Sequence, residues 1–209
     1  MTPKGSFFVE FLLAGVCLGQ TPPGFVPSDK PGSSAYVAPM PTPWEDPGFM
    51  QAIWVQSPNN NKRPSGVVVD TVVVHSTVIE SLKQTVFAFC REASQVSAHY
   101  VIGKDGSIVQ CVSTFRRAWH AGVSRDVEGR PNVNHFSIGI ELVNRDDGID
   151  PYPTAQTDAL CMLIRTLKRR FPLKYITSHE YIALPHGRKT DPRGFPWATL
   201  TDCDLKIVK

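Results

Sequence analysis

The stretch TVVVHST, residues 71–77, decides the fold, because a run of valines that stops at a histidine is typical of a buried strand with a polar group at its end. The strand is expected to span Val67–His75. Strands covered on both faces have continuous apolar runs of this kind, and they occur in sheets flanked by helices. Ligands on such sheets tend to bind where strands end and loops begin, so His75 is a candidate ligand.

The regions on either side of this run alternate between helices and strands. Apolar residues at helical spacing predict a helix near Ile79–Glu92 and a longer one over Thr154–Phe171, with Thr154 as the N-cap of the longer helix. The expected strands are the two arms of a hairpin, Ala98–Ile102 and Ser107–Val112, followed by Phe136–Val143 and Tyr175–Ser178, before a short closing helix that starts near Pro196. This alternation predicts an α/β fold, a single domain with a central mixed β-sheet flanked by helices.

The N-terminal part of the chain differs in composition from the rest. Residues 1–19 place Lys4 before an apolar stretch interrupted by Glu10, and they form a candidate secretory signal peptide. Residues 20–50 are rich in proline, glycine and serine without periodicity, which predicts an extended linker or strap ahead of a folded domain at 51–209. If the leader functions, the chain is exported to the periplasm, the cell envelope or the extracellular space. The alternative location is the cytoplasm.

Charge and hydropathy exclude several classes of partner. The formal net charge is only +3 and the basic residues are scattered, so no nucleic-acid partner is expected. No segment is apolar enough to predict a transmembrane span, and a monomer is expected. After removal of the leader, an even number of cysteines would remain, which fits an oxidising compartment but leaves their pairing open. These cysteines are Cys90, Cys111, Cys161 and Cys203.

A second informative stretch, SHEYIALPHGRKTDP, covers residues 178–192 and follows a short predicted strand. It contains His179, Lys189 and Asp191. Together with His75, the histidine and the aspartate would give zinc three protein ligands and leave a fourth position open, which is the catalytic arrangement. Glu141 lies inside an apolar strand, where a carboxylate is costly unless something binds it.

Five motifs in this order resemble one enzyme family. They are VVVHST (72–77), VSAHYVIGKDGSIVQ (96–110), RAWHAG (117–122), NHFSIGIEL (134–142) and SHEYIALPHGRKTDP (178–192). They are similar to the zinc-dependent N-acetylmuramoyl-L-alanine amidases of type 2, the AmpD-like enzymes, which are related to phage lysozyme-type amidases and peptidoglycan recognition proteins. The resemblance runs from about Val67 to Trp197 and leaves the N-terminal region uncovered.

The resemblance implies a hydrolase that cleaves the amide between N-acetylmuramic acid and L-alanine in peptidoglycan or muropeptides, with residues 51–209 as its catalytic domain. It implies one Zn²⁺ per chain, held by His75, His179 and Asp191. Glu141 would be the general acid and base, and Lys189 would stabilise the oxyanion.

Trp119 and His120 stand in a motif that borders the substrate groove in this family, and they are expected to contact the substrate, as is Asn134. Arg188 is a further candidate because an arginine fork suits the carboxylates of a stem peptide, with a solvated arginine as the alternative. For His120, a structural role beside a tryptophan is an equal alternative, and Asn134 is also interpretable as a turn residue. His186 lies in the ligand loop, but the family motif places the metal on Asp191 instead.

Two alternatives to a cell-wall amidase follow from the same residues. The first is a recognition module that binds peptidoglycan without cleaving it, and such modules have typically lost at least one zinc ligand. Here every ligand position carries a competent residue, which argues against this alternative. The second is a zinc hydrolase of another amide bond, for which the same catalytic groups would serve.

Overall fold

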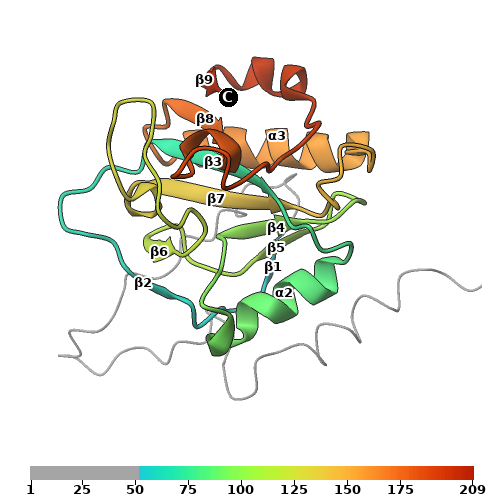
Figure 1. Ribbon diagram of the computed structural model, residues 1–209, viewed down its shortest axis with the longest axis horizontal. Coiled ribbons are helices and arrows are strands. Elements are labelled where there is room, and N and C mark those ends of the chain that lie inside the picture. The colour runs from blue at the N-terminus through green and yellow to red at the C-terminus, as the bar shows by residue number, and fades with distance from the viewer. Residues whose placement is uncertain (1–51) are drawn as a thin grey trace, which may run out of the picture.

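The computed structural model describes residues 52–209, in which a seven-stranded mixed sheet lies between helices (Figure 1). The strand order is β1-β5-β4-β7-β3-β8-β9, and β2 pairs with β6 in a separate antiparallel ribbon. The predicted α/β domain with a central mixed sheet is therefore confirmed. The candidate signal peptide and the predicted linker, residues 1–19 and 20–50, lie outside the described residues.

The elements alternate along the chain as the sequence pattern suggests. The strands are β1 (Ile53–Trp54), β2 (Asn60–Lys62), β3 (Thr71–Ser76), β4 (Tyr100–Ile102), β5 (Ile108–Gln110), β6 (Arg116–Ala118), β7 (Ser137–Leu142), β8 (Tyr175–Ser178) and β9 (Lys206–Val208). The helices are α2 (Leu82–Cys90), α3 (Thr154–Lys168) and α4 (His179–Ile182), with 3-10 helices η2 (Glu92–Ser94), η3 (Val133–His135) and η4 (Trp197–Cys203).

The centre of the sheet consists of parallel strands whose carboxyl ends meet at one edge. Strand β3 lies between β7 and β8 and runs parallel to both. In this register His75 is paired with Glu141 across β3 and β7, and Val74 is paired with Ser178, the residue before His179. The register therefore brings three polar side chains to the same edge, although they are far apart in the sequence.

The two faces of the sheet have different coverings. Helix α3 packs on the face that carries Val72, Val74 and Ile140, and it contributes buried residues such as Leu163 and Leu167 to that cluster. Side chains alternate along a strand, so their neighbours point to the other face, where α2 also packs (Figure 1). By the same alternation His75 and Glu141 point away from α3, and their face is the one that carries the site.

Most predicted elements are confirmed, with shorter bounds. The hairpin of β4 and β5 is antiparallel with Val101 opposite Val109, as predicted from the Asp-Gly turn. Helix α2 starts later than expected because Ser81 caps it, accepting a hydrogen bond from the backbone of Gln84. The expectation that Thr154 caps α3 is wrong, since Pro153 occupies the N-cap and Thr154 is the first helical residue. None of the helices in the described region is long and apolar enough to cross a membrane.

Candidate metal centre and active site

Three side chains with metal-binding atoms meet at the carboxyl edge of the sheet. His75 is near the end of β3, His179 starts α4 directly after β8, and Asp191 follows in the loop. Their ligand atoms all lie within 4.8 Å of one another, and all three residues are buried. Asp191 Oδ2 lies 3.2 Å from His75 Nδ1 and 3.1 Å from His179 Nδ1. Two imidazole nitrogens and one carboxylate oxygen form the donor set of a catalytic zinc site.

The protonation states of this cluster suit a cation. Burial and the nearby His179 lower the pKa of His75 to about 4, so its imidazole is neutral at pH 7 and has a free lone pair. Burial alone would raise the pKa of Asp191, but the neighbouring imidazoles of His179 and His75 outweigh it and hold that pKa below its ordinary value. The carboxylate is therefore ionised, which is the form that binds a metal.

Glu141 is a half-buried residue beside the cluster. Desolvation of its carboxyl group and the charge of Asp191 together raise its pKa from 4.5 to about 8, against the opposite effect of Lys189. Its Oε2 atom is buried and has no hydrogen-bond partner among the described residues. A carboxyl group with a pKa near the working pH can both accept and release a proton, which is what a general acid and base must do.

The cluster opens into a groove of about 210 Å³. Glu141, Lys189 and the candidate metal ligands His179 and Asp191 line its polar end. Its remaining wall is largely apolar and comes from the loop after β3, from α2 and from the segment before β4; the side chains include Val78, Ile79, Ala88, Phe89 and Val96. Lys189 forms no hydrogen bond or ion pair with any described residue, so its ammonium group is available to a ligand in the groove.

Val78 has an unusual backbone at this wall. Its φ angle is 60°, in the left-handed region that a β-branched residue rarely adopts, and its side chain is 64% exposed. Thr77 next to it donates a hydrogen bond from its hydroxyl to the carbonyl of Ile79 and accepts one from the backbone of Asn144. The local hydrogen bonds thus hold an apolar side chain in the groove at a conformational cost.

The residues expected to contact the substrate lie in different places. Trp119 is half-buried, lines the groove and donates its indole N–H to Asn61. Asn134 is occupied by the backbone, because its Oδ1 accepts the N–H groups of His120 and Ala121 at 3.1 and 2.8 Å. Arg188 is exposed and donates to the carbonyls of nearby loops rather than lining the groove.

His120 also lines the groove, but its ring nitrogens are engaged within the protein. Its Nδ1 lies 3.0 Å from His75 Nε2, and its Nε2 lies 3.1 Å from Ser137 Oγ. Burial and the neighbouring His75 hold the pKa of His120 well below its ordinary value. His186 in the ligand loop is exposed and takes no part in the metal-binding cluster.

Arg63 supports the segments around the site, and sequence reasoning missed this role. Its guanidinium donates to the carbonyls of Thr114, Asn134, His135 and Ser137, and these contacts join the β6 region to the start of β7. Burial and the nearby Arg117 lower its pKa to about 9. A single arginine between polar residues carries no periodic pattern, so only the fold reveals this role.

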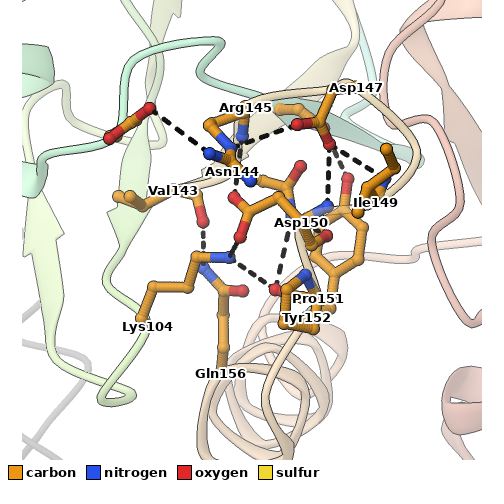
Figure 2. Close-up of polar contacts among 12 residues, drawn as sticks. Lys104, Val143, Asn144, Arg145, Asp147, Ile149, Asp150, Pro151, Tyr152 and Gln156 are labelled. Carbon is orange, nitrogen blue, oxygen red and sulfur yellow. Dashed lines mark hydrogen bonds and ion pairs between the residues drawn. The ribbon is translucent and has the colours of Figure 1, made fainter.

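The loop between β7 and α3 supports the aspartate that belongs to the cluster. Asp146 accepts hydrogen bonds from the hydroxyl of Thr190 at 2.8 Å and from the backbone of Arg193 at 2.6 Å, on either side of Asp191. Figure 2 shows the polar contacts that hold this loop in place. Lys104 points toward Asp150, and the distance between Nζ and Oδ1 is 2.8 Å. The loop therefore fixes the position of Asp191 relative to the sheet.

Tyr152 makes a further connection in this region. Its hydroxyl lies 2.7 Å from Ser76 Oγ, next to His75, and 3.3 Å from the carbonyl of Arg193. It thus joins the end of β3 to the loop that carries Asp191. Sequence reasoning missed both Asp146 and Tyr152, because their partners are more than thirty residues away along the chain.

Comparison with known proteins gives consistent results. The family model for N-acetylmuramoyl-L-alanine amidases matches residues 63–194. The 1,6-anhydro-N-acetylmuramyl-L-alanine amidase AmpD of Enterobacter cloacae is 35% identical over 174 residues, which cover 74% of this chain and 90% of that protein. AmpD of Escherichia coli (strain K12) is 47% identical over 107 residues, which cover 50% of this chain and 56% of that protein.

Solved structures show the same likeness. A selenomethionine derivative of AmpD superposes with a TM-score of 0.60 at 32% identity, covering 79% of this chain and 98% of that one. The amidase AmiD from E. coli, in complex with anhydro-N-acetylmuramic acid-L-Ala-D-gamma-Glu-L-Lys, superposes with a TM-score of 0.59 at 29% identity. That alignment covers 69% of this chain and 61% of the AmiD chain.

Proposed function

The chain belongs to the N-acetylmuramoyl-L-alanine amidase family and hydrolyses the amide bond between N-acetylmuramic acid and L-alanine; we propose that it does so with one zinc ion held by His75, His179 and Asp191. The observation that carries this proposal is the convergence of two imidazole nitrogens on one carboxylate oxygen at 3.1 and 3.2 Å. Zinc in such a donor set supplies a Lewis acid that polarises a carbonyl and makes water nucleophilic near neutral pH.

Two residues beside the cluster carry out the proton transfer and stabilise the oxyanion. Glu141 takes the proton of the attacking water and returns it to the amine of L-alanine as that amine leaves. Its pKa of about 8 and its position beside His75 in the strand register suit both steps. Lys189 points its free charge into the same groove and stabilises the negative charge that develops on the carbonyl oxygen.

Soluble muropeptides are the substrate that we propose. Several relatives are named 1,6-anhydro-N-acetylmuramyl-L-alanine amidase, and AmiD was solved with an anhydro-muropeptide bound. The apolar wall of the groove lies next to its polar end, where the methyl groups of lactate and L-alanine, which both substrates share, would lie. Stem-peptide residues beyond L-alanine would extend along this wall.

The activity is tested by digestion of two substrates, soluble anhydro-muropeptides and intact sacculi, with mass analysis of the products. The expected products are free stem peptides that begin with L-alanine, lost on treatment with a chelator and restored by zinc. Cleavage that is indifferent to the chelator would contradict the zinc centre. Binding of either substrate without any cleavage would support a recognition module instead.

A pair of histidine variants from one loop provides a matched control. His179→Asn removes a proposed ligand and should abolish both zinc binding and turnover. His186→Asn changes an exposed histidine seven residues later and should leave both intact. Equal zinc content in the two variants would remove His179 from the site.

The location of the enzyme depends on residues 1–19. We propose that this leader exports the chain, with residues 20–50 as a linker that holds the domain away from the membrane or another surface. Mass analysis of the mature protein after cell fractionation tests this proposal. An intact Met1 in the cytoplasmic fraction would support the cytoplasmic alternative.

A further inference from the structure

His120 lies between Ser137 and His75 in a hydrogen-bonded chain that ends on a proposed zinc ligand. We propose that His120 is a positioning residue, which fixes the ring orientation and the tautomer of His75 so that Nδ1 faces the metal. The inference rests on the proposed zinc site. It assigns His120 a role that acts through His75 rather than through contact with the substrate.

The direction of each hydrogen bond follows from chemistry. A backbone carbonyl can only accept, so the 2.6 Å contact between Ser137 Oγ and the carbonyl of Val133 uses the single hydroxyl proton of Ser137. Ser137 Oγ must then accept from His120 Nε2, which lies 3.1 Å away. His120 therefore carries its proton on Nε2.

The same reasoning fixes His75. A neutral imidazole has one N–H, so His120 Nδ1 is an acceptor and takes its hydrogen bond from His75 Nε2 at 3.0 Å. The proton of His75 is then on Nε2, and its Nδ1 presents a lone pair to Asp191 Oδ2 at 3.2 Å. Two acceptors so close together repel each other unless a cation lies between them. The hydrogen-bonded chain thus prepares the site for a metal.

Two independent features hold the His120 ring in this position. Gly139 in β7 lies directly beneath it, and a Cβ atom at that position would be 2.7 Å from His120 Nδ1. Only glycine leaves the ring room against the strand, since a real Cβ almost never approaches another atom so closely. The backbone N–H groups of His120 and Ala121 are both held by Asn134 Oδ1. Strand β7 and the loop that carries His120 therefore both fix the position of the ring.

His99 provides the matched control. It is also fully buried, and its Nδ1 accepts a hydrogen bond from the backbone of Gly139 at 3.0 Å. Its Nε2 is 3.0 Å from the carbonyl of Arg116 and from a guanidinium nitrogen of Arg63, and it forms no hydrogen bond with a proposed zinc ligand. Its ring lies edge to face with that of His120, with 5.8 Å between centroids, but no hydrogen bond joins the two. Replacing His99 therefore removes a buried imidazole next to His120 and leaves the hydrogen bonds that end on His75 in place.

The test uses the tautomer of His75 and the zinc affinity of the purified protein. Long-range ¹H–¹⁵N NMR of the metal-free chain should show His75 protonated on Nε2. His120→Phe should remove this preference and weaken zinc binding about ten- to a hundredfold in competition with a chelator, the usual effect of losing such a partner. His120→Asn keeps an acceptor near the position of Nδ1 and should restore most of the affinity. His99→Asn should change neither the tautomer of His75 nor the zinc affinity.

Unchanged His75 tautomer and zinc affinity in a folded His120→Phe protein would overturn the proposal. If that variant does not fold, the tautomer of His75 is measured in Ser137→Ala instead. This variant keeps both imidazole rings but leaves His120 free to change tautomer. A mixed tautomer of His75 is then expected, and an unchanged one refutes the proposal. Because the NMR reading needs no metal, a wild-type chain that binds no zinc and cleaves nothing would refute the proposed function separately.

Discussion

Replacing Glu141 by glutamine is predicted to stabilise the metal-free fold at neutral and alkaline pH while abolishing turnover. Glu141 is half-buried in the wall of the groove, its Oε2 atom is buried, and desolvation raises its pKa from 4.5 to about 8. The folded protein therefore binds the proton of Glu141 more tightly than the unfolded chain does. The contribution of Glu141 to stability is therefore most favourable below pH 4.5, falls as the pH rises through the interval between the two pKa values, and is least favourable above about 8.

The size of the effect follows from the same shift. A tenfold change in an equilibrium is worth about 1.4 kcal/mol. The raised pKa of Glu141 therefore destabilises the metal-free fold by roughly 5 kcal/mol well above pH 8, where the folded protein must bury the charge, and by roughly 3 kcal/mol at pH 7, where it must take up a proton. Glutamine has nearly the same shape but no charge. The variant avoids this cost at every pH, although it loses the proton transfer on which turnover depends.

Urea denaturation in the presence of a chelator, from pH 4 to pH 9, measures this difference. The free energy of unfolding of Glu141→Gln minus that of the wild type should grow with pH over the window given above. Glu92→Gln, at an exposed glutamate, is the control and should show no such growth. Parallel curves for Glu141→Gln and the wild type would refute the reasoning, because the carboxyl group would then titrate alike in the folded and unfolded states.

Three further predictions concern the cluster, its support and the groove. Asp191→Ala should lose zinc, whereas Glu141→Ala should retain it and lose most turnover; metal analysis of both purified variants checks this, and equal zinc contents would contradict the assignment. Arg63→Met should lower the free energy of unfolding by about 2 to 4 kcal/mol, because several backbone carbonyls lose their hydrogen-bond donor. Urea denaturation measures this change. A decrease no larger than that caused by replacing an exposed arginine would show that water takes the place of the guanidinium. Val78→Gly should raise the free energy of unfolding by about 1 kcal/mol, because glycine adopts the left-handed backbone without strain. It should also raise KM for muropeptides, because an apolar side chain is lost from the groove. Thermal denaturation measures the first effect and steady-state kinetics the second, and an unchanged KM would show that Val78 makes no substrate contact.

The parts of the fold that the sequence predicted are those with strong local patterns. The valine run that became β3 and the Asp-Gly turn between β4 and β5 each carry their own signal within a few residues. The ribbon of β2 and β6 carries none, because Asn60–Lys62 is polar and its partner lies more than fifty residues away. Pairing of that kind depends on tertiary context, which a single sequence does not display.

The site shows the same division. The cluster residues stand at strand ends or beside a strand-end loop, so pattern and family resemblance suggested His75, His179 and Asp191 together, and the structure brings them within 4.8 Å. Ser137 and Asp146 are ordinary polar residues in the sequence. Their roles are defined only by partners that the fold supplies, His120 for one and the Asp191 loop for the other.

The parallel register of β7, β3 and β8 has a consequence for how the enzyme matures. Parallel strands cannot be joined by a hairpin, and each pair forms only after a long intervening segment has been closed. No part of the chain shorter than the stretch from His75 to Asp191 contains the complete donor set. We therefore expect tight zinc capture to begin only when the whole domain has folded, so that the metal stabilises the finished enzyme by mass action and offers little to its folding intermediates.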